Sequence, residues 1–212
     1  MAGFRYIKSR AGTTDVARKK LQIAASATVA KNDALEFVDG KLKRVNAATD
    51  SPKYIAGEDA TATATSITKI HVIDCAESMS LFEVDFTPLI NGTACNSNST
   101  ATQVVVALTD GTTDDLKGGL VYIPELNETR IITGNTYSSN VVTITVAEAF
   151  STAPTTTHTC RVVPFGFGTT ALKLHASNMH NAISSAIADI TGGKVSIYDV
   201  DMEKKVATVF FV

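Results

Sequence analysis

LEFVDGKLKRVNAATDSPKYIAGED, residues 35–59 of the chain, begins with a complete β-hairpin signal. Asp39 and Gly40 separate two short runs, and an Asp-Gly pair readily adopts the positive φ angles of a two-residue type I′ turn. This turn predicts that Phe37 lies opposite Leu42, as an apolar cross-strand pair. A polar connection then leads into a second apolar run, which brings the chain back toward the hairpin.

The composition around this hairpin favours β-structure. Apolar residues make up 44% of the 212 residues and charged residues 19%, which is enough for a core and too little charge for disorder. Thr, Ala and Val are abundant, whereas Pro is sparse and Trp is absent. Such a chain is typical of a β-protein with one large or two small domains.

Charge and hydropathy bear on the possible partners. The net charge is −2, and the aromatic residues do not alternate with basic clusters, so we expect no nucleic-acid partner. The N-terminus lacks the apolar core of a signal peptide, and no apolar run approaches the roughly 20 residues of a membrane span. We therefore expect synthesis in a cytoplasm, no membrane partner, and free thiols at Cys75, Cys95 and Cys160.

The distribution of turn-rich segments predicts the domains. Small polar residues gather at 91–102, 151–159 and 165–170. Short strands with regular turn signals lie between the first and last of these segments, and they predict an inserted small β-domain over 92–165. Residues 21–91 and 166–212 then form one discontinuous domain, like a β-barrel or β-sandwich.

One short helix is expected before the C-terminus. It lies within residues 172–190, where apolar residues recur at helical spacing, Ser177 is a suitable N-cap and Gly192 follows the end. The stripe consists of Met179, Ile183, Ala186, Ile187 and Ile190. A final hairpin over 194–212 ends in an apolar run, which predicts a core strand. The predicted fold class is therefore mainly β.

The first 20 residues are predicted to form a polar N-terminal arm. They contain six lysines and arginines against Asp15 alone. The arm is either a solvated tail or a segment that becomes ordered on a neighbouring subunit. The candidate interface residues are its basic, aromatic and bulky apolar side chains: Phe4, Arg5, Tyr6, Ile7, Lys8, Arg10, Arg18, Lys19 and Lys20.

No catalytic motif was found. The four histidines fit no HExxH pattern, and GxSxG, GxGxxG and Walker motifs are absent. Asp199, Asp201 and Glu203 alternate along a strand, so their carboxylates suit either a Ca²⁺ site or a solvated hairpin tip. Two lysines follow at once and the glycine of an EF-hand loop is missing, which favours the tip. We predict no enzyme activity, no cofactor and no metal.

The order of features across residues 34–60 resembles a known family. A short strand ends in Asp-Gly, a basic strand and a polar connection follow, and the sequence IAGEDA leads into a Thr/Ala-rich strand. The residues that carry the resemblance are Ala34 to Gly40, Leu42, Val45, Ala47 to Thr49 and Ile55 to Ala60. This pattern resembles the capsid decoration proteins, or structural cement proteins, of tailed bacteriophages.

The resemblance implies a non-enzymatic, β-rich virion protein. Such a protein binds the outer surface of the major capsid protein lattice as a homo-oligomer, a dimer or a trimer, and stabilises the head. The inserted domain departs from the smallest family members and leaves open which domain contacts the capsid. Two alternatives stand beside it. One is a carbohydrate-binding or adhesin-like module of a phage tail or surface structure, although the absence of Trp counts against it. The other is an enzyme of unrecognised type.

Overall fold

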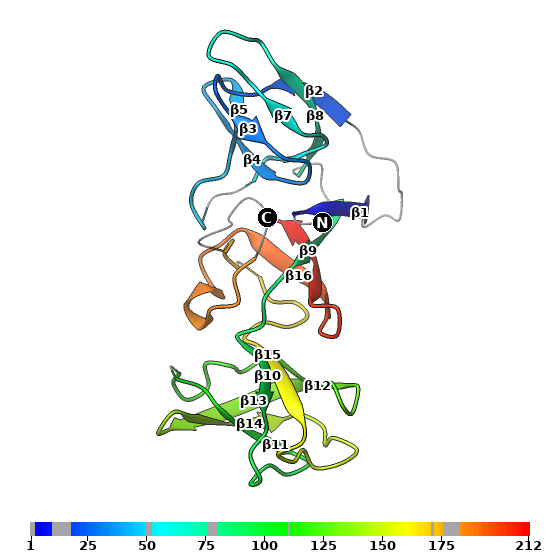
Figure 1. Ribbon diagram of the computed structural model, residues 1–212, viewed down its shortest axis with the longest axis vertical. Helices are drawn as coiled ribbons and strands as arrows, with labels where there is room; N and C mark the ends of the chain where they lie inside the picture. The colour runs from blue at the N-terminus through cyan, green and yellow to red at the C-terminus, as the bar shows by residue number, and fades with distance from the viewer. Residues whose placement is uncertain are drawn as a thin grey trace.

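The computed structural model describes residues 3–9, 18–49, 52–75, 80–109, 111–170, 172–175 and 183–212. The molecule is elongated and has three β-lobes stacked along its long axis (Figure 1). An N-terminal lobe and a barrel lie at the two ends, and both chain termini lie in the central lobe (Figure 1). The protein is mainly β, as predicted.

The N-terminal lobe is a five-stranded antiparallel sheet with a small two-stranded sheet beside it. A parallel bridge between Ile23 and Leu42 brings the two edges of the larger sheet together around a buried aliphatic cluster. The larger sheet has the order β2 (Arg18–Gln22), β8 (Lys69–Asp74), β6 (Tyr54–Ala56), β4 (Ala34–Val38) and β5 (Lys41–Arg44), and the smaller sheet pairs β3 (Thr28–Val29) with β7 (Ala60–Thr61).

The β4–β5 hairpin confirms the predicted turn and register. Phe37 lies opposite Leu42, and Asp39 and Gly40 have φ angles of 51° and 75°. Leu35 and Leu42 are fully buried, whereas the ring of Phe37 is 46% exposed and packs edge-on against Tyr54. The hairpin therefore contributes two leucines to the core and one phenylalanine to the surface.

The central lobe is a four-stranded antiparallel sheet made from both ends of the chain. Its C-terminal hairpin confirms the prediction for 194–212, and Val209 in the last strand is fully buried. Its core cluster also includes Ile55 of the N-terminal lobe and Leu120 of the barrel. The order is β1 (Arg5–Ser9), β9 (Ser80–Asp85), β17 (Val206–Phe211) and β16 (Val195–Asp201).

The barrel is a six-stranded sheet that is nearly closed. An antiparallel bridge between Cys95 and Val106 joins its two edge segments around an aliphatic core. The strand order is β10 (Ile90–Ala94), β15 (Thr159–Val163), β12 (Leu120–Ile123), β13 (Glu128–Ser138), β14 (Val141–Val146) and β11 (Gln103–Ala107). These strands occupy the part of the chain for which an inserted domain over 92–165 was predicted.

Residues 18–75 have a buried cluster of their own and also contribute Ala34, Val45, Ile55 and Ile73 to the central core. The segments predicted as one discontinuous domain, 21–91 and 166–212, contain two separate sheets that share this central core.

The prediction of a polar arm is wrong for residues 4–9. Phe4 is fully buried and β1 pairs with β9. Phe4 and Tyr6 join the central apolar cluster, whereas Ile7 is exposed. Arg10 lies outside the described residues.

The predicted helix is also wrong where the structure describes it. Leu172 and Leu174 form isolated β-bridges with Val195 and Ile183, and the helical turn present is the 3₁₀ helix η1 (Ile187–Asp189). The leucines follow a two-residue period because both enter the central core. Ser177 and Met179 lie outside the described residues. Within the described ranges, no helix has the length and apolarity to cross a membrane.

Candidate functional site

The predicted interface residues at the N-terminus are mostly engaged within the chain. The ring of Phe4 lies 5.1 Å from that of Phe211. The guanidinium group of Arg5 donates to Glu83 at 3.1 Å and to Asp85 at 3.0 Å, and the bond to Asp85 raises the pKa of Arg5. These contacts attach the N-terminal segment to β9 and β17, so Phe4 and Arg5 stabilise the central sheet rather than a separate arm.

The next three candidates lie further along β1, and their side chains become more exposed from Tyr6 to Lys8. Tyr6 is half-buried, with its ring edge-on to Phe82 at 5.9 Å. Ile7 and Lys8 are exposed. Of the candidates in β1, Ile7 and Lys8 are therefore the ones that present side chains to a partner.

The remaining candidates form an exposed basic row on β2, which consists of Arg18, Lys19 and Lys20. The Nζ of Lys19 lies 2.6 Å from the carboxylate of Asp74, and Lys20 lies opposite His71 in the register. This row is in the N-terminal lobe, whereas Ile7 and Lys8 are in the central lobe, so the structure divides the predicted set between two sheets.

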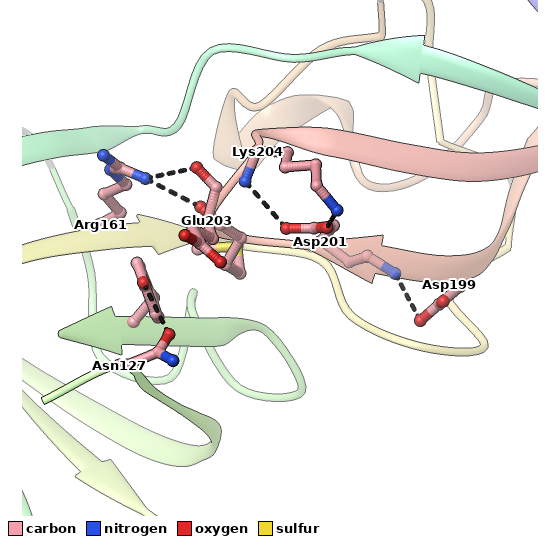
Figure 2. A network of polar contacts seen from close by, with 9 residues as sticks. Asn127, Arg161, Asp199, Asp201, Glu203 and Lys204 are labelled. Carbon is pink, nitrogen blue, oxygen red and sulfur yellow. Dashed lines mark hydrogen bonds and ion pairs between the residues drawn. The ribbon is translucent and has the colours of Figure 1, made fainter. Parts of the chain in front are cut away.

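A polar network joins the barrel to the central lobe (Figure 2). Arg161 in β15 donates to the backbone carbonyls of Met202 at 3.1 Å and Glu203 at 2.8 Å, in the turn of the C-terminal hairpin. Its guanidinium lies 5.6 Å from the ring centre of Tyr122, whose hydroxyl donates to Asn127. One arginine therefore satisfies two turn carbonyls and fixes the hairpin against the barrel.

The acidic row of the same hairpin is used for turn formation. Asp201 accepts bonds from the backbone N–H and the Nζ of Lys204, and these bonds lower the pKa of Asp201. Asp199 accepts from the backbone N–H of Val200, next to an irregularity in the strand register (Figure 2). The described residues contain no group of three or more His, Cys, Asp or Glu side chains arranged to hold a metal ion.

The three cysteines are free and buried. The hydrogen bond between the thiols of Cys95 and Cys160, together with burial, raises the pKa of Cys160 well above its ordinary value. Burial also raises the pKa of Cys75. Since the thiolate is the reactive form, Cys75 and Cys160 are poor nucleophiles. His158 bonds to Thr155 in a turn, and His180 lies outside the described residues.

An exposed apolar groove lies between the barrel and the central lobe. Phe167 is 78% exposed and its ring lies 6.3 Å from that of Tyr198, while Ile131 across the groove is 55% exposed. The groove has a volume of about 430 Å³, and Leu120, Thr129 and Asp199 also line it. We call this feature the junction groove. It has the apolar character and size of a contact site for a protein side chain or loop.

The sequence analysis missed the junction groove. One signal was present, because Phe167 lies between two glycines in a turn-rich segment, and a turn tip projects its side chain into solvent. For Ile131 the signal was its neighbour Ile132 in β13. Successive residues of a strand point to opposite faces, so only one of the two isoleucines can point into the barrel core.

No known protein family matches the chain, and the comparisons found no similar curated protein or solved structure.

Proposed function

We propose that this protein is a capsid decoration protein that binds the outer surface of a phage head and reinforces it without catalysis. The observation that carries the proposal is the resemblance of residues 34–60 to the cement family. These residues form the β4–β5 hairpin and the returning strand β6, and the two are joined by pairing of Ala34 with Ile55.

The residues after β6 also belong to this unit. The Glu58 carboxylate accepts from the backbone N–H of His71, and the Asp59 carboxylate accepts from that of Lys31. The Ile-Ala-Gly-Glu-Asp sequence thus closes the lobe through defined hydrogen bonds. The segment that resembles the family is therefore one structural unit with its own buried leucines.

The elongated shape supports a role as a clamp. Three lobes in line offer separate surfaces to neighbouring subunits of a lattice, and several weak contacts raise avidity without one strong site. Because the protein binds the assembled shell and not its separated subunits, mass action stabilises the shell.

For the capsid contact we propose the exposed members of the predicted set. These are Ile7, Lys8, Arg18, Lys19 and Lys20. Phe4, Arg5 and Tyr6 are omitted because their side chains contact β9 and β17 within the chain.

The test is co-sedimentation of the purified protein with expanded heads that lack it. The variant carrying Arg18→Glu and Lys20→Glu should bind at least about tenfold more weakly, because two charge reversals introduce repulsion at the contact. The control carries Lys31→Glu and Lys194→Glu, which are also exposed, and should bind as the wild type does. Absence of binding by the wild type to expanded heads would refute the function itself.

The carbohydrate-binding alternative calls for a flat aromatic platform. The rings of Phe167 and Tyr198 are the exposed aromatic pair at the junction groove, and they are inclined at 55° to each other. Two rings inclined to each other do not form one flat platform for stacking on a sugar ring.

A further inference from the structure

Two of the three buried cysteines lie together in the barrel. Cys95 directly follows the end of β10, and Cys160 belongs to the neighbouring strand β15. In the register Cys160 lies opposite Thr93. The backbone N–H of Cys95 donates to the carbonyl of His158, so the pairing continues and the two cysteines are diagonal neighbours on one face of the strand pair. Both are buried in the barrel core, and their thiols are hydrogen-bonded to each other.

The two sulfur atoms are within reach of a covalent bond. Diagonal neighbours of an antiparallel pair are about 7–8 Å apart at their Cα atoms, which is slightly beyond the usual span of a disulfide. The thiols already contact each other, so the bond needs only a small approach of the backbone. Cys95 leads into a turn at the end of β10, where the chain has room for this movement.

Cys95 also lies at the closing seam of the barrel. Its side chain is buried, and so is that of Cys160. At Cys95 the two edges of the barrel meet through the isolated bridge with Val106, whereas the other strands are joined by ladders. A single bridge opens at lower cost than a ladder, so local opening of the seam admits a small oxidant to Cys95.

We propose that Cys95 and Cys160 are the site of an intramolecular disulfide, which forms with hydrogen peroxide as the oxidant. The thiolate of Cys95 attacks one peroxide oxygen and the O–O bond breaks. The released hydroxide takes up the proton that Cys95 had lost, and Cys95 becomes a sulfenic acid. The sulfur of Cys160 then attacks that of Cys95, and the S–O bond breaks. The leaving hydroxide takes the proton of Cys160, so two thiols and one peroxide give one disulfide and two waters.

The order of the two steps follows from the hydrogen bond between the thiols. This bond lowers the pKa of Cys95, against the effects of burial and of Glu125. The same bond, together with burial, raises the pKa of Cys160. Since the thiolate is the reactive form, Cys95 reacts first. The first step consumes the Cys95 thiolate to which the Cys160 proton is bonded, and this allows Cys160 to react second.

Cys75 provides a matched control. It is also buried, but in the central core, and no thiol is among the groups that shift its pKa. Cys75→Ser should therefore react as the wild type does. In this variant an intramolecular disulfide can only join Cys95 to Cys160, because these are its two remaining cysteines. None of these steps depends on capsid binding, so the inference is independent of the proposed function.

The experiment is treatment of the purified full chain with hydrogen peroxide, followed by mass spectrometry of the intact protein without reduction. The wild type and Cys75→Ser should each lose two hydrogen atoms, and a reducing dithiol should restore them. The melting temperature should rise by about 5 °C on oxidation, because the cross-link closes a loop of roughly 65 residues in the unfolded chain.

Two single variants test the order of the steps. Cys160→Ser removes the second thiol, so oxidation should stop at the sulfenic acid of Cys95, which dimedone captures as a stable adduct. Cys95→Ser should give neither a dimedone adduct nor the loss of two hydrogen atoms. Thermal melting verifies that both variants are folded.

Three results would overturn the inference. One is a wild type that keeps all three thiols after treatment with peroxide. Another is a disulfide that joins two chains or includes Cys75. The third is a dimedone adduct in folded Cys95→Ser but not in folded Cys160→Ser, which would exclude Cys95 as the thiol that reacts first.

Discussion

The barrel and the N-terminal lobe are both small β-structures whose edges meet at one isolated bridge, Cys95 to Val106 in the barrel and Ile23 to Leu42 in the N-terminal lobe, but their strand ladders differ in length. In the barrel, β13 is 11 residues long and pairs with β12 along one part and with β14 along the other. In the N-terminal lobe the strands have two to six residues, and a single parallel bridge at Leu42 joins the edges. Continuous ladders therefore define the barrel, whereas the N-terminal lobe depends more on its loops.

Each of these lobes anchors a loop with one buried polar side chain. In the N-terminal lobe the Asp33 carboxylate accepts from the backbone N–H of Ala30 at 2.7 Å and from Arg44 at 2.6 Å. In the barrel the Asn135 side chain accepts from the N–H of Leu116 and donates to the carbonyl of Thr112. One anchor is an ion pair and the other is a neutral amide, so removal of the two side chains should reduce the unfolding free energy by different amounts.

The largest effects are expected from matched truncations in the two cores. Leu42 and Ile144 are both fully buried, and replacement of either by Ala should cost about 3 kcal/mol of unfolding free energy through lost burial and a cavity. In hydrogen exchange, Leu42→Ala should expose the whole N-terminal lobe, because it removes the closing residue. Ile144→Ala should expose the barrel alone. Equal loss of protection in both lobes would contradict separate cores.

Removal of the polar anchors should have the next largest effects. Asp33→Ala should cost about 3 kcal/mol, because it leaves the partly buried guanidinium of Arg44 and the partly buried N–H of Ala30 without their acceptor. Asn135→Ala should cost about 2 kcal/mol, since the groups that it leaves are neutral. Urea denaturation measures both. A larger loss of unfolding free energy for Asn135→Ala than for Asp33→Ala would contradict the expectation that the charged anchor contributes more.

A smaller effect is expected at the joint between the barrel and the central lobe. Arg161→Ala removes two hydrogen bonds to the C-terminal turn and the contact with the Tyr122 ring, which together should cost about 1.5 kcal/mol. Amides of residues 201–206 should exchange faster. Arg130→Ala is the control, because Arg130 covers the Phe150 ring within the barrel. It should leave the exchange of the turn unchanged.

The smallest effect concerns acid pH. The pKa of Asp201 is lowered by its bonds from Lys204. A lowered carboxyl pKa gives stability that is present above the ordinary value of about 4 and is lost as pH falls through the folded-state value. The turn should therefore loosen below about pH 4 in the wild type. In Asp201→Asn this contribution is absent at every pH, so a variant with the same acid response as the wild type would contradict the assignment. The amide chemical shift of Lys204, followed as the pH is lowered, measures this loosening of the turn.

Local turn chemistry made part of the fold predictable. Asp39 and Gly40 determine the register of the first hairpin, and the alternation of β14 and the final apolar run were equally clear. The strand at Phe4 was missed because a short apolar pattern beside many charges resembles a solvated tail. Those charges have partners elsewhere in the chain, such as Glu83 for Arg5, and sequence position alone does not indicate them.

The helix was predicted wrongly and the junction groove was not predicted, and in both cases the reason lies in contacts that form only on folding. Isoleucine spacing near Ile187 suited a helix, but Leu172 and Leu174 form isolated bridges with Val195 and Ile183. The groove depends on two loops and three strands that meet only in the folded molecule. Four of the nine candidate interface residues, Lys8, Arg18, Lys19 and Lys20, are exposed charged side chains, a property that the sequence indicates directly.

The central claim is that the protein reinforces a phage head, and the most direct test is the temperature at which heads release their DNA. Heads should be prepared without the protein from the virus that encodes it, and the purified chain should then be added back. We predict that heads without it assemble but release DNA at a lower temperature, and that its addition restores the higher temperature. Release at the same temperature with and without the protein would contradict the claim.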